Sequence, residues 1–239
     1  MGDSLGDRMK TNYEGPSKFK LTRRLPVIIR LDGRAFHTYT KGFKKPFDPV
    51  LMVTMVDAAT KVAEEMQGFK IAYIQSDEVS FFLSDTDLIT TQPWFGNSKS
   101  KMESVSASLM TAHFNRQMLS LGIEKLATFD ARSFSIPDVE VANYFLWRAK
   151  DWERNSLSMY CQANFSHKQL HGKRKEEQHE LLHSIGKNWT TDLTAQERNG
   201  TYIIKKANGG YRVTSDIHPD YTELHTAVLG TMFGRGTNG

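Results

Sequence analysis

The feature that most constrains the fold is the order of four short apolar runs and two long helical patterns in the first 136 residues. The runs are rich in the β-branched and aromatic residues typical of strands, and they span 27–31, 69–74, 79–83 and 126–136. Between them, apolar residues recur at helical spacing over 49–66 and 99–121. The resulting order, β-α-β-β-α-β, is that of the split ferredoxin-like arrangement. We therefore predict an α+β fold with the end of the first strand beside the central hairpin.

The last hundred residues have a different pattern. Helical segments are predicted over 138–165 and 175–184, and Asn-Gly turns flank a small hairpin made of 201–206 and 211–214. Signals after 215 are weak, and the Gly-rich end from 230 is expected to be loose. We expect two units: a catalytic core with a polar N-terminal arm over 1–137, and a helical extension with the hairpin packed on it over 138–239.

Composition narrows the class of protein. Apolar residues make up 39% of the 239 residues, which is enough for a core and excludes a disordered chain. The single cysteine excludes a disulfide framework and fits the reducing cytoplasm. No stretch has the length of a membrane helix, and no apolar signal core is seen near the start. The net charge of +4 is compatible with a nucleic-acid or nucleotide partner. Cys161 lies in an apolar helical stretch, so we expect it to be buried and inert.

Three acids are placed where the predicted strands end. Asp32 follows the first strand, and Asp77 and Glu78 lie between the two strands of the central hairpin. Each motif alone is more typical of a solvated turn. On a βαββ order, however, the strands lie side by side, and clustered carboxylates need a cation between them. Oxygen ligands suit Mg²⁺, and two such ions would activate an attacking hydroxyl and stabilise a leaving phosphate.

Basic residues suit an anionic partner. Lysines follow the first strand and open the second long helix, where a triphosphate could bind: Lys41, Lys44, Lys45, Lys99 and Lys101. Two further basic segments are either solvated or contact an RNA backbone: Lys18, Lys20, Arg23 and Arg24, and Lys173 with Arg174. Histidine pairs at i,i+4 lack the glutamate of the zinc motif, so a metal role is not favoured for His167, His171, His179 and His183.

Five stretches resemble signatures of the tRNA(His) guanylyltransferase superfamily. They are R-L-D-G-R-A-F-H at 30–37, K-P-F-D at 45–48, A-Y-I-Q-S-D-E-V-S-F at 72–81, F-D-A-R at 129–132, and W-R-x-x-D-x-x-x-N at 147–155. The resemblance covers about residues 25–206, in the order that the family has. Two long signatures of this kind are far more specific than a lone turn motif.

The resemblance implies a polymerase-type palm that works in reverse and adds nucleotides to the 5′ end of tRNA, after the 5′ phosphate has been activated with ATP or GTP. It implies that Asp32, Asp77 and the Gly33 carbonyl hold two Mg²⁺, with Glu78 as a third catalytic acid. It assigns nucleotide binding to Arg30, Gly33, Arg34, Ala35, Phe36, His37, Lys45, Ser76 and Lys101. Asn155 would contact tRNA, and the enzyme would be a homotetramer.

Two departures from the family pattern bear on the substrate. Glu153 stands where eukaryotic guanylyltransferases have a histidine, and Ala131 replaces the glycine of F-D-G-R. The first favours the bacterial and archaeal relatives, which refill missing 5′ nucleotides by templated pairing. A dedicated tRNA(His) guanylyltransferase, another palm-fold enzyme such as a nucleotide cyclase, and a non-catalytic RNA-binding module remain as alternatives.

Overall fold

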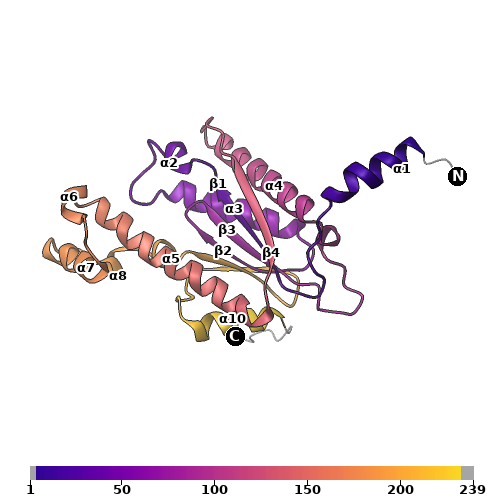
Figure 1. Cartoon of the computed structure of the whole chain (residues 1–239). Helices are drawn as coiled ribbons and strands as arrows, with labels where there is room; N and C mark the ends of the chain where they lie inside the picture. Colours follow the sequence, from indigo (N-terminus) through magenta and orange to yellow (C-terminus); the bar gives the residue numbers. More distant parts are fainter. Residues whose placement is uncertain (1–3, 233–239) are drawn as a thin grey trace.

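The computed structural model describes residues 4–232 and is built on one six-stranded antiparallel sheet with the strand order β4-β1-β3-β2-β5-β6 (Figure 1). The strands are β1 (Val27–Gly33), β2 (Phe69–Gln75), β3 (Glu78–Leu83), β4 (Phe129–Ser135), β5 (Thr201–Lys205) and β6 (Tyr211–Thr214). The α-helices are α1 (Leu5–Met9), α2 (Phe36–Tyr39), α3 (Pro49–Glu65), α4 (Lys99–Ser120), α5 (Val141–Gln162), α6 (His167–Leu170), α7 (Lys175–Ser184), α8 (Trp189–Asp192), α9 (Ala195–Asn199) and α10 (Tyr221–Met232). Short π and 3₁₀ segments are η1 (Lys10–Glu14), η2 (Gly15–Ser17), η3 (Trp94–Asn97) and η4 (Asp138–Glu140).

Along the chain, the first four strands alternate with the two long helices in the order β1-α3-β2-β3-α4-β4. The protein thus has the α+β class that the sequence predicts. The pair β5–β6 joins the same sheet, because β5 pairs antiparallel with β2. The part of the chain after residue 138 therefore extends the sheet as well as covering it.

Side chains along β1 point alternately into two hydrophobic cores, one on each face of the sheet. Val27, Ile29 and Leu31 face α3 and α4, whereas Ile28 packs in the core formed with α5 and α10. Because side chains of a strand alternate between faces, the even-numbered positions that follow lie on the α5 face. The polar end of β1 is thereby directed toward α5.

Helix α3 begins where the sequence predicts. The Asp48 carboxylate accepts hydrogen bonds from the backbone amides of Val50 (2.9 Å) and Leu51 (3.1 Å), and Pro49 occupies the first helical position. Phe47, just before this cap, is buried against Trp152 of α5, with ring centroids 6.1 Å apart. The loop before α3 is therefore held by the Asp48 cap on α3 and by the contact of Phe47 with α5.

The N-terminal arm is helical. Helix α1 and η1 project from the body of the protein and bury no residue (Figure 1). The arm rejoins the body where Lys20 bridges Ser98 and the Leu21 amide donates to the Asn97 carbonyl (2.9 Å). No helix in residues 4–232 is long and apolar enough to cross a membrane.

Helix α10 lies where the sequence signals are weak. Its buried residues Leu224 and Val228, one turn apart, pack in the core formed with α5. Two apolar anchors were too few to predict the helix without its partner. The Gly-rich segment expected to be loose begins within α10, and its residues 233–239 lie outside the described range.

Cys161 is fully buried on α5, as predicted, and burial raises the pKa of its thiol to about 11. Because the thiolate is the reactive form, we expect the native protein to resist thiol reagents at neutral pH. Labelling with a chromogenic disulfide reagent should be slower by more than about tenfold in the native protein than in urea. Rapid labelling of the native protein would contradict this placement.

Candidate active site

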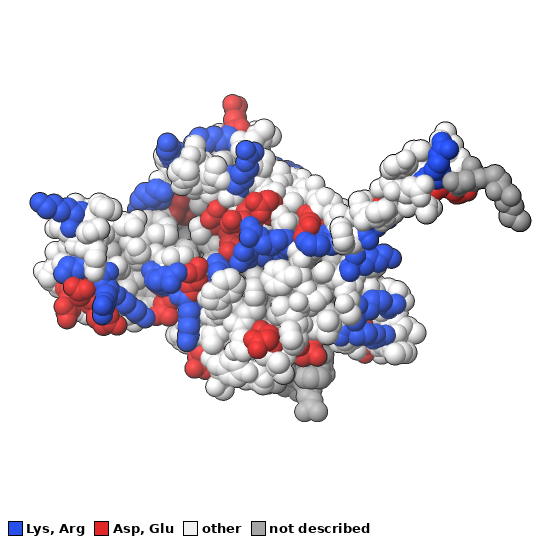
Figure 2. All heavy atoms as spheres, viewed as in Figure 1, with Lys and Arg blue, Asp and Glu red and all other residues white. Residues whose placement is uncertain are grey.

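Acidic side chains gather near the centre of one face of the molecule, with basic side chains directly beside them (Figure 2). The turn between β2 and β3 has only two residues, Ser76 and Asp77, because Gln75 pairs with Glu78. Ser76 adopts the left-handed conformation (φ 50°) that such a turn favours. The Gly33 amide donates to the Asp77 carbonyl (3.1 Å), which ties the turn to the end of β1.

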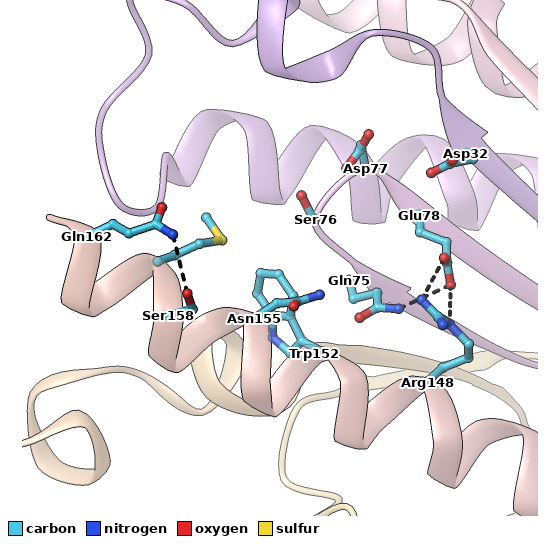
Figure 3. A pocket seen from close by; sticks show the side chains of 11 residues that line it. Asp32, Gln75, Ser76, Asp77, Glu78, Arg148, Trp152, Asn155, Ser158 and Gln162 are labelled. Carbon is cyan, nitrogen blue, oxygen red and sulfur yellow. Dashed lines mark hydrogen bonds and ion pairs between the residues drawn. The ribbon is translucent and has the colours of Figure 1, made fainter. Parts of the chain in front are cut away.

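Register then brings the acids together. Asp32 on β1 is the cross-strand partner of Glu78 on β3. The carboxylates of Asp32 and Asp77 lie on the same side of the turn, while Glu78 points away from them toward α5 (Figure 3). The juxtaposition expected from the predicted strand order is therefore present.

Gly33 is required by packing. A Cβ at this position would lie 2.2 Å from the Phe36 ring, which is buried against Phe114 and Phe129. The chain turns back sharply after β1, with Ala35 in the left-handed region (φ 54°). Phe36 is thus a core residue that shapes the loop, and its side chain faces the core.

Helix α5 forms the opposite wall of a cavity of about 320 Å³ (Figure 3). The strand side supplies Asp32, Gln75, Ser76, Asp77 and Glu78. The helix side supplies Arg148, Trp152, Asn155, Ser158, Met159 and Gln162. These positions recur at three- and four-residue intervals, so they share one face of the helix. The cavity combines carboxylates at one end with uncharged polar groups along α5.

Glu78 is held by an ion pair. Arg148 donates from Nε to Oε1 (2.7 Å) and from Nη2 to Oε2 (2.8 Å) of Glu78, and Gln75 donates to Oε1 (3.1 Å). Arg148 also pairs with Asp151 (3.1 Å). The sequence allowed Glu78 to be either a solvated turn residue or a catalytic acid. The ion pair shows that it is not a solvated turn residue. Its charge is already balanced, which leaves Asp32 and Asp77 as the unpaired acids.

The electrostatics of Asp77 follow from its surroundings. The pKa of Asp77 is raised to about 6, chiefly because the carboxyl is buried and to a smaller extent because the carboxylates of Asp32 and Glu78 are near, while hydrogen bonds from Ser76 and the backbone oppose the shift. A cation between Asp32 and Asp77 would favour the charged form. Residues 4–232 contain no group of three or more His, Cys, Asp or Glu side chains placed to hold a metal. Two carboxylates are nevertheless the usual protein share of an Mg²⁺ site that also holds substrate phosphates.

The structure brings one of the nine predicted nucleotide-binding residues to the cavity. Ser76 lines it, and so does Asn155, which the resemblance assigned to tRNA. The others lie outside its lining: Arg30, Gly33, Arg34, Ala35, Phe36, His37, Lys45 and Lys101. Arg34, His37, Lys45 and Lys101 are exposed, whereas Lys99 is paired with Glu103. Trp152, Ser158, Met159 and Gln162 were missed, although their helical spacing from Arg148 was visible in the sequence.

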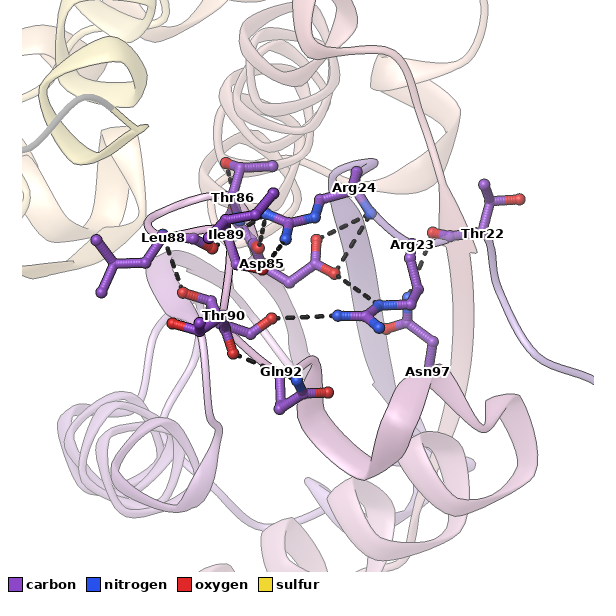
Figure 4. Close-up of polar contacts among 12 residues, drawn as sticks. Thr22, Arg23, Arg24, Asp85, Thr86, Leu88, Ile89, Thr90, Gln92 and Asn97 are labelled. Carbon is purple, nitrogen blue, oxygen red and sulfur yellow. Dashed lines mark hydrogen bonds and ion pairs between the residues drawn. The ribbon is translucent and has the colours of Figure 1, made fainter.

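Arg24 corrects an expectation from the basic segments. Its guanidinium donates to the carbonyls of Asp85 (3.0 Å), Leu88 (3.1 Å) and Ile89, and its amide donates to the Asp85 carboxylate (Figure 4). Arg23 contacts Asp85 and the Thr91 carbonyl. Because these donors are used within the chain, Arg24 shapes the 85–92 loop and is not available to an RNA backbone.

The other residues expected to contact tRNA remain at the surface. Lys18, Lys20, Lys173 and Arg174 are exposed. Lys18 pairs with Glu14 (3.0 Å) and Lys173 with Glu177 (2.8 Å). Exposed pairs of this kind contribute little to stability, so they would exchange readily for phosphate contacts.

Comparisons with known proteins identify the family of the chain. The profile of the tRNAHis guanylyltransferase family matches residues 6–137, which include Asp32, Asp77 and Glu78. The chain belongs to this family. Its members are nucleotidyltransferases, and the protein is an enzyme of that class.

Solved and curated relatives extend the match. A bacterial tRNA(His) guanylyltransferase-like protein in complex with ATP is 41% identical, with a TM-score of 0.88 over 95% of this chain and 99% of that chain. A second such bacterial structure, in complex with GTP, is 37% identical with a TM-score of 0.80 and the same coverage. The tRNA(His) guanylyltransferase of Schizosaccharomyces pombe is 30% identical over 220 residues, which are 81% of this chain and 80% of that protein.

Proposed function

We propose that this enzyme adds nucleotides to the 5′ end of truncated tRNA in the 3′–5′ direction, with the incoming base chosen by pairing to the opposite strand. The observation that carries the proposal is the meeting of Asp32 and Asp77 at the end of a cavity large enough for a nucleotide. The β4-β1-β3-β2 order supports a polymerase-type palm, because these acids lie at adjacent strand ends. The bacterial relatives in complex with ATP and GTP support nucleoside triphosphates as substrates.

Asp32, Asp77 and the Gly33 carbonyl would hold two Mg²⁺, which supply charge neutralisation for the phosphates and activation of the attacking hydroxyl. The raised pKa of Asp77 fits a site designed for a cation. Arg148 and Gln75 position Glu78 away from the unpaired acids. Ser76 at the turn and the exposed Lys45 and Lys101 would bind the triphosphate. Arg30, Arg34 and His37 would bind nucleotide beside β1.

Templated repair is favoured over dedicated guanylate addition by Glu153. This residue forms an ion pair with Lys175 of α7 (2.5 Å), so it braces α7 against α5. A histidine would not place a negative charge at this contact. Glu153 therefore contributes to packing of the helical extension. We infer that the incoming base is selected by pairing geometry at the palm.

Three further features belong to the proposal. We retain the division into a core over 1–137 and an extension over 138–239, whose boundary coincides with the end of the family match. The exposed apolar residues Leu5, Met9 and Tyr13 lie four residues apart on the projecting arm, which supports assembly into the proposed homotetramer. The single cysteine supports a cytoplasmic location.

The base opposite the missing nucleotide should decide what is added. Truncated, 5′-phosphorylated tRNAs that differ only at this base should switch the incorporated nucleotide, because a mismatched end holds the attacking 3′-hydroxyl away from the phosphate. A misplacement of about 1 Å can cost on the order of a hundredfold in rate. The measurement is extension with ATP, Mg²⁺ and each nucleotide in turn. Addition of guanylate whatever the opposing base, and only to tRNA(His), would identify a dedicated guanylyltransferase. A cyclic product would identify a cyclase.

A further inference from the structure

Trp147 is an unusual surface residue beside the cavity. It is 54% exposed, whereas Trp94, Trp152 and Trp189 are each less than 9% exposed. It lies on α5 next to Arg148, whose guanidinium is 4.5 Å from its ring centroid. Tyr144 meets it edge-on at 5.9 Å. These contacts hold the indole in place while more than half of its surface stays open to solvent.

One arginine, Arg30, lies beside this ring, and a second, Arg132, lies directly opposite Arg30 on the neighbouring strand. Arg30 has its guanidinium 5.9 Å from the Trp147 centroid, and its buried Nε has no hydrogen-bond partner. Within residues 4–232 no carboxylate forms an ion pair with Arg30. Arg132 is its direct partner across β1 and β4, and its one pair, with Asp130, is long (3.6 Å) and half-exposed. Like charges directly opposite each other destabilise a sheet, so this pair is suited to an anion.

Arg30 and Arg132 lie close to the unpaired acids of the cavity. Arg30 precedes Asp32 by two residues on the same face of β1, a separation of roughly 7 Å along the strand. A phosphate between Arg30 and Arg132 would therefore lie next to the site of transfer.

We propose that Trp147, Arg30 and Arg132 form a nucleotide-docking platform, in which a nucleobase stacks on the indole and its phosphate binds the two arginines. Aromatic stacking tolerates any base, which suits an enzyme that must accept different nucleotides. Arginine binds phosphate with two parallel donors and so orients it. The platform rests on the proposed function for its ligand, which is either the 5′ nucleotide of an RNA or a free nucleoside triphosphate.

Tryptophan fluorescence reports on the platform because the Trp147 ring is 54% exposed, and the Trp147→Phe variant separates its signal from that of Trp152, which lines the cavity. The probes are GTP, ATP, and a truncated acceptor-stem hairpin RNA with a 5′ phosphate or a 5′ hydroxyl. We expect saturable quenching, and the probe that produces it identifies the source of the nucleotide. A preference for the phosphorylated hairpin over the hydroxyl form would place the RNA 5′ end there. No quenching by any probe would overturn the proposal.

Variants separate stacking from charge. Trp147→Phe should lose the quenching but keep most of the affinity, whereas Trp147→Ala should weaken binding by about tenfold. Arg132→Gln should weaken binding and lower the slope of log affinity against log salt by about one. Arg212→Gln, on the exposed edge strand β6, makes the same charge change at the other side of the sheet and should have little effect. Unchanged quenching in Trp147→Phe, or wild-type affinity in Trp147→Ala, would overturn the proposal.

The fluorescence measurement does not require turnover, so failure of the platform and failure of the proposed function can be distinguished. If the wild-type protein fails to extend truncated tRNA, the proposed function fails, whatever the fluorescence shows. If it extends tRNA while Trp147→Ala binds and extends normally, the platform alone is wrong. Far-ultraviolet circular dichroism of each variant, which should match the wild type, excludes misfolding as the cause of weaker binding.

Discussion

Asp77→Asn should reduce nucleotide transfer on the order of a thousandfold or more, because it removes one of two unpaired carboxylates from the place where the phosphates react. The same loss is expected for Asp32→Asn. Both the activation of the 5′ phosphate and the addition of the nucleotide should fail, since the same acids serve both steps. Single-turnover assays that follow each step separately measure this.

The loss should not come from unfolding. Burial raises the folded-state pKa of Asp77 to about 6, so its charge opposes folding above that pH, and the opposition disappears as the pH falls below the ordinary value of 3.8. Asp77→Asn should therefore melt at the same temperature as the wild type or higher at pH 7. Asp138→Asn, an exposed acid outside the cavity, is the matched control and should retain activity. Near-normal turnover in Asp77→Asn would rule out the proposed site.

Arg148→Met should lower the free energy of unfolding by about 3–5 kcal/mol, because it leaves the carboxylate of Glu78, whose side chain is only 14% exposed, without its partner. Arg148 is 8% exposed, and it contacts both Glu78 and Asp151. Arg148→Lys should recover only part of the loss, since an ammonium cannot make the two parallel hydrogen bonds. Urea unfolding at neutral pH is the measurement.

Two comparisons isolate the ion pair. The double variant Arg148→Met with Glu78→Gln should be more stable than Arg148→Met alone, because no unpaired charge remains buried. Arg154→Met removes an arginine that pairs with the same Asp151 but is 73% exposed at its side chain. It should cost less than about 1 kcal/mol. Equal losses for Arg148→Met and Arg154→Met would show that burial of the pair is unimportant.

Local patterns in the sequence determined most of the elements around the site. Alternation and β-branched residues located β1, and the Asp48-Pro49 pair located the start of α3, because caps and strand periodicity depend on neighbouring residues alone. The acids at the ends of β1 and β2 were visible for the same reason. Their signatures also resembled those of the family that the comparisons later showed.

Only the tertiary structure decided which of those residues work together. The bidentate pair of Arg148 with Glu78 joins residues 70 positions apart, and no local pattern reports a partner at that distance. Arg24 looked like an RNA contact but is satisfied by carbonyls of the 85–92 loop. The wall of the cavity along α5 and the exposure of Trp147 likewise depend on how one helix lies across the sheet. That placement comes from packing among distant apolar side chains, so the sequence could predict the acids but not the surfaces that surround them.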